Sequence, residues 1–456
     1  MVTAPRRSLL LGSLLGALLW APIAQGQVDD EQPVPPPDTG VPGPWVTYAT
    51  PPLLARETRA CSMRLPLCVH SAGNIPGRQV LDVLASAERA WSTLTGALDL
   101  PPPDVDQDDL RYHVYLVDPT LATARRGVTY PRARDVRSRI DRARAFSLID
   151  SSMHAGCNLD AVVTREVARA VLYRAAPATA EGIARAHTTY LAQLVAPCAL
   201  AFAVEEASAF QSRPDRTVCD AEPEAGASAD GASLFWSRID WAYGRQPGAI
   251  ILGQWALAPS MTDVGAQRWH DEPDAFDVLR VSFKNALSTN STISDLLLDT
   301  AVARAFMGSA DDGLHQPETR TLGDAAKVPL DWNIEWPAKP RRLSHREPVQ
   351  PSGASYVVVR RDGAPKGARL RVEIAWEEHS LFRWAFVKLD AQGRELGRVP
   401  IATRERATEA QATLVDLDNV DRVLLVGVNV GDPAYRFDPD DEVWEPHGWL
   451  LTIAAE

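Results

Sequence analysis

The residues best placed to do chemistry lie between positions 161 and 174, in the stretch AVVTREVARAVLYR. Arg165, Glu166 and Arg169 have the spacing that zinc-dependent hydrolases fill with His-Glu-x-x-His on a helix. In that pattern two histidines one helical turn apart hold the metal, and the glutamate acts as general base on the bound water. The stretch therefore has the frame of a hydrolytic zinc site, with arginine at both metal-ligand positions.

Arginine cannot replace histidine in such a site. A guanidinium group stays protonated, offers no lone pair and repels Zn²⁺. We therefore expect no metal at Arg165 and Arg169, and we expect Glu166 to form an ion pair, with Arg169 or with another cation across a cleft. The alternative is that the three residues are an ordinary charge pattern on a helix rich in alanine and valine.

Apolar residues surround these charges. On a helix of about 3.6 residues per turn, an apolar stripe that includes Val163, Val167 and Val171 lies opposite the charged side chains. Leucine, valine and tyrosine residues also flank the charges, so the predicted helix is apolar around most of its circumference. Such a helix is normally buried, and its charged residues then face a cleft or a paired partner.

A zinc site built from other residues is an open alternative. Glu205, next to Glu206, lies about where a third, glutamate ligand would be expected downstream of the motif. His154 precedes the motif helix, and His187 lies in the next predicted helix, 178–195, so that these side chains could converge. An isolated histidine is more often a surface or packing residue. We predict neither a metal nor another cofactor.

The acidic stretch FDPDDEVWEPHG, residues 437–448, holds a second group of candidate ligands. Asp438, Asp440 and Asp441 offer the hard oxygen ligands that Ca²⁺ takes in exported proteins. Solvated acids in a loop are the simpler interpretation. The calcium site is therefore kept as a secondary prediction.

The elements that must position these residues change in type along the chain. Strands are predicted at 111–119 and 144–153, and helical spacing is found over 78–98 and almost continuously from the motif to residue 307. Farther on, the apolar period changes to two, as in ARLRVEIAW (368–376), and turn signals such as DAQG separate short strands. We predict an α+β fold, with a mainly helical domain followed by a C-terminal antiparallel β-sandwich.

The chain divides into five predicted segments. Residues 1–26 have the basic pair, short apolar run and small-residue cleavage pattern of an export signal, of the general or the twin-arginine type. A proline-rich acidic spacer follows at 27–50, then the α+β domain at 51–316, a linker at 317–352 and the sandwich at 353–456. Because no later stretch is long enough to span a bilayer, we expect a periplasmic or extracellular protein with no integral membrane segment after cleavage.

The composition limits the classes of partner. The formal net charge is −12, and removal of the two arginines of the signal makes it more negative. Such acidity argues against nucleic acid and anionic membranes as partners. With 45% hydrophobic and 23% charged residues, the chain is an ordinary globular protein. The expected partner is an extracellular or envelope protein or a glycan.

The five cysteines can form disulfides in an exported chain. Cys61 and Cys68 flank a short loop that contains a proline. Cys157 and Cys198 flank two predicted helices, and a bond between them would clamp this pair together. Cys219 is left over. The pairing stays open, because connectivity cannot be read from a sequence.

Several longer stretches resemble a known group of proteins. They are RYHVYLVD, APATAEGIARAHTTYLAQLVAPC, GASLFWSRIDWAYG, PGAIILGQWALAPSMT, HDEPDAFDVLRVSFKNAL and DTAVARAFMG, with FRWAFVKLDAQGRELGRV and DPDDEVWEPHGW in the sandwich. Together they are similar to large secreted myxobacterial proteins described as zinc metallopeptidases, and to relatives whose zinc motif has degenerated. The resemblance implies a zincin-like first domain. It places the group's two histidines at Arg165 and Arg169 and its general base at Glu166.

These observations lead to three hypotheses. The first is an exported, catalytically inactive metallopeptidase-like protein with a binding or scaffolding role. The second is an active zinc metallopeptidase that uses substitute ligands. The third is a glycan- or protein-binding module formed by the C-terminal sandwich. Because both departures from the zinc motif fall on metal ligands, we favour the first.

Overall fold

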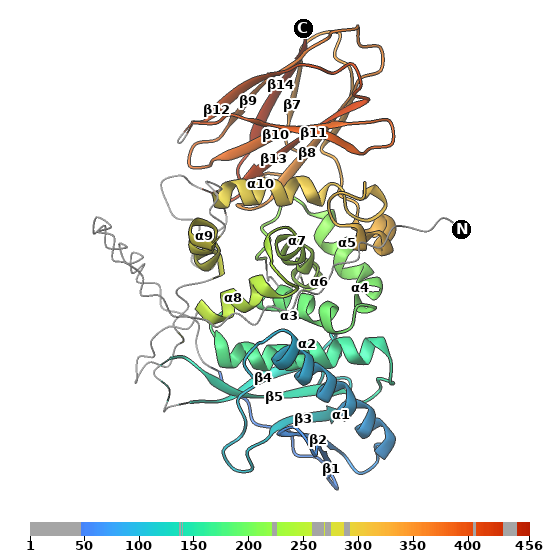
Figure 1. Ribbon diagram of the computed structural model, residues 1–456, viewed down its shortest axis with the longest axis vertical. Coiled ribbons are helices and arrows are strands. Elements are labelled where there is room, and N and C mark those ends of the chain that lie inside the picture. The colour runs from blue at the N-terminus through green and yellow to red at the C-terminus, as the bar shows by residue number, and fades with distance from the viewer. Residues whose placement is uncertain are drawn as a thin grey trace, which may run out of the picture. The chain divides into compact units, whose positions relative to one another are not determined.

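The computed structural model describes residues 47–135, 138, 140–220, 226–257, 269, 275–286, 292–404, 407–431 and 445–456. In these ranges the chain is α+β, with a mixed sheet, a long helical region and two further sheets at the C-terminus (Figure 1). None of the helices in the described ranges is long and apolar enough to cross a membrane. The export signal and the calcium candidates Asp438, Asp440 and Asp441 lie outside the described residues.

The first sheet consists of β1 (Thr58–Cys61), β2 (Leu67–Ser71), β3 (Tyr112–Val117), β4 (Gly127–Arg134) and β5 (Ala143–Asp150). The strand order is β1-β2-β3-β5-β4, with the three central strands parallel and the two edge strands antiparallel to their neighbours. The sequence predicted only β3 and β5. Strand β4 carries Pro131 next to a bulge, which is typical of an edge strand and obscures its apolar period.

Helices α1 (Gly77–Ser92) and α2 (Cys157–Ala175) pack against each other, and α2 also packs on β4 and β5. A single π-helical segment, η1 (Thr93–Ala97), continues α1. Val163, Val167 and Val171 of α2 are buried in the main hydrophobic core. The motif helix is therefore buried on most sides, as its apolar circumference predicts.

Further helices complete the helical region. They are α3 (Glu181–Val195), α4 (Ala199–Phe202), α5 (Val204–Ser212), α6 (Gly226–Gly231), α7 (Ser233–Tyr243), α8 (Ala249–Leu257), α9 (Ala275–Ala286) and α10 (Ile293–Arg304), followed by the 3-10 segments η3 (Gly308–Ala310) and η4 (Pro317–Ala326). Thr292 begins α10 with a capping box, in which its hydroxyl accepts from the Asp295 N–H and the Asp295 carboxylate accepts from the Thr292 N–H.

Two sheets form the C-terminal part. One has the order β11 (Glu395–Ile401), β10 (Phe382–Leu389), β13 (Arg422–Asn429), β8 (Ala354–Arg360) and β6 (Trp332–Glu335), and the other has the order β12 (Glu409–Leu414), β9 (Leu370–Trp376), β14 (Trp449–Ala455) and β7 (Arg341–Ser344). Trp384 of the first sheet and Trp449 of the second meet edge to face, with ring centroids 5.3 Å apart. Because α10 packs on β10 and β13, one hydrophobic core runs from the helical region into these sheets.

The structure differs from the predicted organisation in two details. Strands β6 and β7 lie within 317–352, the stretch predicted as a linker, and each belongs to one of the two C-terminal sheets. They have four residues each, which is too short for a period of two to stand out in a sequence. Strand β6 also pairs with β8 in parallel, so the sandwich is not purely antiparallel.

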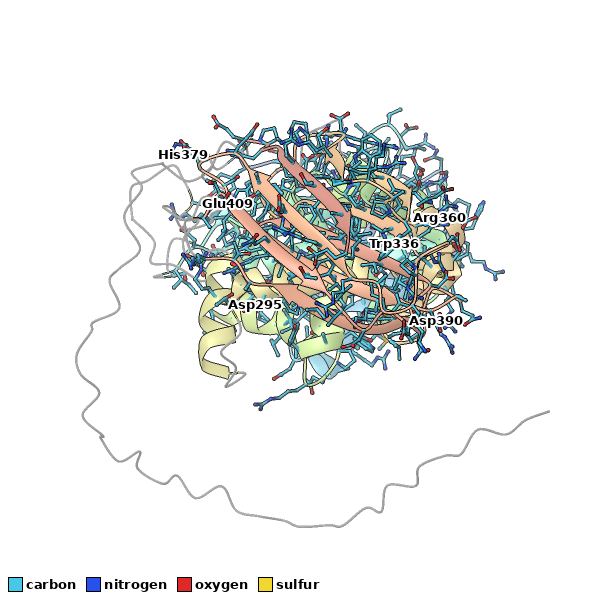
Figure 2. The ribbon with its side chains drawn as sticks, turned by 90° about the horizontal axis from the view of Figure 1, so that it is seen from above. Asp295, Trp336, Arg360, His379, Asp390 and Glu409 are labelled. Atoms are coloured by element: carbon cyan, nitrogen blue, oxygen red, sulfur yellow. A yellow bond between two sulfur atoms is a disulfide. The ribbon has the colours of Figure 1, made fainter. Side chains whose placement is uncertain are left out.

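Figure 2 shows the C-terminal sheets from above, with Arg360, Asp390 and Glu409 around their rim.

Two disulfides are present. Cys61 bonds Cys68 across β1 and β2, and Cys157 bonds Cys198, with Cα atoms 4.0 Å and 6.1 Å apart respectively. The second bond ties the first residue of α2 to the residue before α4. Cys219 is buried and belongs to neither bond. Such disulfides fit an exported protein.

Candidate functional site

The two arginines of the motif take different partners. Arg165 donates from Nε to Oε1 of Glu166 at 3.0 Å, and from Nη2 to the carbonyl oxygen of Arg125 at 2.6 Å. Nη2 of Arg169 lies 2.7 Å from Oε2 of Glu181, on α3. The expected pairing of Glu166 with Arg169 is therefore not found, because a carboxylate from the next helix takes that guanidinium and the adjacent Arg165 takes Glu166.

Glu166, the position of the general base, is buried, with 3% of its surface exposed. Its Oε2 accepts a hydrogen bond of 2.8 Å from the hydroxyl of Thr129, on the edge strand β4, while its Oε1 accepts from Arg165. A Cβ added to Gly127 would come within 2.9 Å of the Glu166 Cγ, so this side chain is pressed against β4. Both carboxylate oxygens are thus held by donors of the protein.

A cleft of about 730 Å³ lies beside α2, where the start of β4 meets α3, α5 and α6. Cations and anions alternate around it. Its charged lining residues are Arg125, Arg126, Arg165, Arg185, Glu181, Glu205, Glu206 and Asp230. Among the described residues, the lining carries as many guanidinium groups as carboxylates, so both signs of charge face the cleft.

Asp230, on α6, joins the cations of this cleft. It forms ion pairs with Arg125 and with Arg185, the second at 2.6 Å, and it accepts from the Thr189 hydroxyl at 3.1 Å. Burial opposes its ionisation, but Arg125, then Arg165 and Arg185, outweigh this effect and hold the pKa of Asp230 below its usual value. Burial and the charge of Arg165 lower the pKa of Arg125 to about 10. One carboxylate is therefore shared by two guanidinium groups of the wall and offsets one of their two positive charges.

Two carboxylates at the start of α5 have a different environment. Glu205 is exposed and Glu206 is half-buried, and both line the cleft. Burial raises the pKa of Glu206 above its usual value. The structure therefore brings Glu205, the predicted third-ligand position, into the cleft that Arg165 lines, whereas Arg169 faces α3. Arg126, in the turn before β4, is exposed at the same cleft.

The proposed substitute ligands do not meet. His154 is exposed. His187 is buried, its Nδ1 accepts from Nε1 of Trp255 at 3.1 Å, and its ring stands edge-on to Trp236. Burial lowers the pKa of His187 to about 3. In the described part of the chain, no group of three His, Cys, Asp or Glu side chains is arranged to hold a metal.

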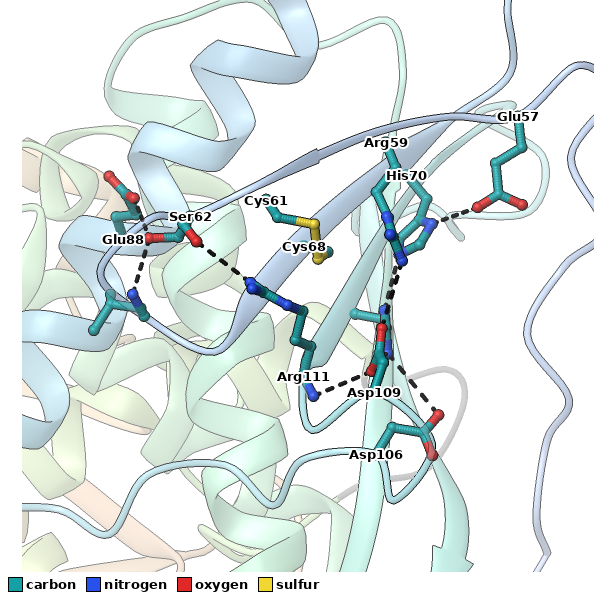
Figure 3. The surroundings of a disulfide bond; sticks show 12 residues. Glu57, Arg59, Cys61, Ser62, Cys68, His70, Glu88, Asp106, Asp109 and Arg111 are labelled. Atoms are coloured by element: carbon teal, nitrogen blue, oxygen red, sulfur yellow. Dashed lines mark hydrogen bonds and ion pairs between the residues drawn. A yellow bond between two sulfur atoms is a disulfide. The ribbon is translucent and has the colours of Figure 1, made fainter.

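A second polar cluster lies beside the Cys61–Cys68 disulfide and was not predicted from the sequence (Figure 3). Nδ1 of His70 lies 2.5 Å from Oε1 of Glu57, and its Nε2 lies 2.8 Å from Nδ1 of His113, whose Nε2 lies 3.1 Å from Oδ1 of Asp109. Burial lowers the pKa of His70, against the effect of the hydrogen bond with Glu57. The sequence offers one signal for this cluster, a histidine in each of two neighbouring strands, His70 in β2 and His113 in β3. Because β2 was not predicted, the two histidines were not recognised as neighbours.

No family model matches the chain. No curated protein matches it either. Among solved structures it is similar to the pre-peptidase C-terminal domain of a Bacillus anthracis collagenase, with 8% identity, 28% of this chain and 99% of that chain covered, and a TM-score of 0.18. A similarity to the infectious bursal disease virus VP2 subviral particle has 10% identity, coverage of 25% and 33%, and a TM-score of 0.17. At such scores these similarities carry no argument about function.

Proposed function

We propose that the protein is an exported, catalytically inactive metallopeptidase-like protein that binds a polypeptide in the cleft beside α2. The observation that carries the proposal is the pairing of both arginines at the zinc-ligand positions, Arg165 with Glu166 and Arg169 with Glu181. Glu166 also accepts from Thr129, so the position of the general base is engaged. With both of its carboxylate oxygens engaged, Glu166 is not placed to activate water for hydrolysis of a peptide bond.

Two features of the fold support the metallopeptidase-like part of the proposal. Helix α2, which carries the motif, follows the last central strand, β5, in the manner of zinc peptidases. Farther along the chain, α5 presents Glu205 to the same cleft as Arg165. The positions of the motif and of the third ligand are thus side by side, while the residues that would bind zinc are not there.

The shape of the cleft favours an extended polypeptide as the ligand. Gly127 and Val128, at the start of β4, line it. β4 is an edge strand of the described sheet, and although its Pro131 carbonyl already accepts from the Ala49 N–H, a bound chain could pair with main-chain groups at the other end of the strand, at Gly127 and Val128. The mixed charges of Arg126, Glu205 and Glu206 suit a chain that carries both signs.

Zinc analysis and a cleavage assay of the purified mature protein test the inactive state. We expect far less than one zinc per chain and no cleavage of casein. Stoichiometric zinc that is lost in Glu205→Ala, His187→Ala or His154→Ala, but kept in the control His379→Ala, would overturn the proposal. Such zinc together with cleavage of casein would establish the active zinc peptidase with substitute ligands.

Binding of an unfolded polypeptide, reduced and carboxymethylated α-lactalbumin, tests the cleft. Reversing a rim charge, in Arg126→Glu or Glu205→Lys, is expected to change the Kd by about tenfold, which corresponds to the loss of one favourable ionic contact of about 1.4 kcal/mol. Glu409→Lys, on β12, is the control. If only Glu409→Lys changes the affinity, the sandwich is the binding module and the cleft is not.

A further inference from the structure

A second hollow, of about 470 Å³, adjoins the cleft. Gln193, on α3, lines both. The short helix α4 stands between them, because its Ala199 and Phe202 line the cleft while Leu200 lines the second hollow. A ligand that lies in the cleft can therefore reach the second hollow by crossing α4.

Helix α4 is held in place by a covalent bond. It has four residues, too few to be stable as an isolated helix. Cys198, the residue before it, is bonded to Cys157 at the start of α2. The ridge that separates the two hollows is thus fixed to the motif helix. Phe202 on this ridge has 60% of its surface exposed.

The second hollow exposes mainly apolar surface, although Arg245, Gln316 and Glu318 also line it. Trp241, on α7, lines it with 50% of its surface exposed, together with Leu194, Pro197 and Pro247. The guanidinium of Arg238, one turn earlier on α7, lies 5.0 Å from the centroid of the Trp241 ring. Exposed indole surface in a concave wall gains free energy when an apolar group covers it.

The polar groups of this hollow differ in how far they are engaged. Asp240 is buried and already accepts from the Tyr190 hydroxyl at 2.6 Å and from the Gly248 N–H at 2.7 Å. Gln246 is exposed at the rim, and Gln193 lies between the two hollows. A side-chain amide offers both a donor and an acceptor, which is the complement of a peptide group.

We propose that this hollow, the Trp241 pocket, receives an aromatic side chain of the polypeptide bound in the cleft. The inference rests on the proposed function and names the residue class that the site selects. A volume of about 470 Å³ lies within the range of roughly 300–1,000 Å³ found for ligand pockets with apolar walls and a few polar groups. An aromatic side chain would cover the exposed indole of Trp241, and the amides of Gln193, Gln246 and Gln316 would remain for the peptide groups beside it. A sugar could use the same amides, which is why a sugar probe belongs in the test.

Binding of N-acetyl-tryptophanamide to the full mature protein, followed by saturation-transfer NMR, tests the pocket. We expect binding that weakens at least tenfold in Trp241→Ala and in Leu200→Glu, which alter opposite parts of the lining. Leu81→Ala, at an exposed leucine of α1, is the matched control and leaves binding unchanged. Unchanged affinity in both pocket variants would overturn the inference, as would binding of methyl glucoside in place of N-acetyl-tryptophanamide.

A second measurement separates this inference from the proposed function. If carboxymethylated α-lactalbumin binds the wild type and Trp241→Ala equally well, the pocket assignment fails while binding in the cleft stands. If the polypeptide does not bind the wild type at all, the proposed function fails, and the occupant assigned to the pocket fails with it. Near-ultraviolet circular dichroism of each variant shows that the fold is kept.

Discussion

Two networks of buried charges in this chain differ in what they join. One centres on Asp230 of α6, which pairs with Arg125 in the turn before β4 and with Arg185 of α3, and lines the cleft. The other centres on His315, whose Nδ1 lies 2.9 Å from Oδ1 of Asp312 and whose Nε2 lies 2.9 Å from Oε2 of Glu395, on β11. The second network therefore connects the helical region to the C-terminal sheets.

The charged groups of the second network are paired with one another. Arg398 donates to Glu395 at 3.0 Å and to Asp299 at 2.7 Å, and Arg238 also donates to Asp299, at 2.8 Å. Burial opposes ionisation of Glu395, but the hydrogen bonds from His315 and Arg398 outweigh it and lower the pKa of Glu395 to about 2. A closed network of this kind is a structural joint. The Asp230 network differs because it adjoins a cleft that Glu205 and Glu206 also line, and this difference is why we propose binding at the cleft and not at the joint.

The largest expected effect is that of Asp230→Asn. The substitution leaves Arg125 and Arg185 without their shared carboxylate, and breaking a buried ion pair typically destabilises a protein by about 3–5 kcal/mol. Urea denaturation measures the loss of unfolding free energy. Glu335→Gln, which breaks an exposed pair with Arg360, is the control and should cost less than about 1 kcal/mol. Equal losses in the two variants would mean that Asp230 does not hold the cleft together.

The first loss of stability on acidification is expected from His187, which belongs to neither network. The pKa of His187 is lowered to about 3 when folded, so between pH 6.5 and 3 the unfolded chain binds a proton that the folded chain does not. The stability that neutral His187 contributes is thus present above pH 6.5 and is lost as the pH falls. We expect a loss of about 2 kcal/mol from pH 6.5 to 4.5.

His187→Gln provides the matched comparison, since its amide oxygen can still accept from Trp255. The variant should lack this early phase. It should retain a second loss of unfolding free energy at lower pH, which is due to Glu395. The pKa of Glu395 in the folded chain is about 2, so its stabilising charge is lost as the pH falls from the ordinary glutamate pKa towards 2. Two identical pH profiles would show that His187 is not the group responsible.

Much of the fold was predictable because it depends on local patterns. The apolar circumference of α2 predicted its burial, and the DAQG turn predicted the hairpin of β10 and β11, whose strands pair across it. Strands β1, β2 and β4 were not predicted. They are short or interrupted, and their pairing is decided by neighbours distant in the sequence.

The site was predictable only in part, for a related reason. The sequence predicts that zinc does not bind at Arg165 and Arg169, because guanidinium groups stand at both ligand positions of a zinc-like spacing. Their partners do not show, because the Arg125 carbonyl, Glu181 and Thr129 come from other elements. Residue types at a known spacing predict what a helix can bind, but only the tertiary structure shows that Asp230 and Glu205 share the cleft.

Glu395→Gln tests the joint between the helical region and the sheets. The amide keeps the shape of the carboxylate but removes the charge that accepts from His315 and Arg398. Hydrogen bonds to charged groups contribute about 1.5–3 kcal/mol, and we expect a loss near the lower end because Glu395 is partly exposed. Calorimetry should also show the single transition beginning to separate into two. A variant with wild-type stability and one sharp transition would place the joint in the hydrophobic core alone.

The smallest expected effect is that of Arg169→Gln, the second arginine of the motif. Arg169 is itself largely buried beside Tyr173, but its partner Glu181 has about half of its side chain exposed and glutamine keeps part of the packing, so we expect a loss of about 1 kcal/mol. Arg165→Gln should cost more, because it leaves the buried Glu166 with Thr129 as its remaining donor. Comparing the two variants by urea denaturation therefore ranks two residues that occupy equivalent positions in the zinc motif. If Arg169→Gln lost more unfolding free energy than Arg165→Gln, the ion pair with Glu181 of α3 would be the more important of the two. The proposed link between the motif and the cleft beside Arg165 would then be contradicted.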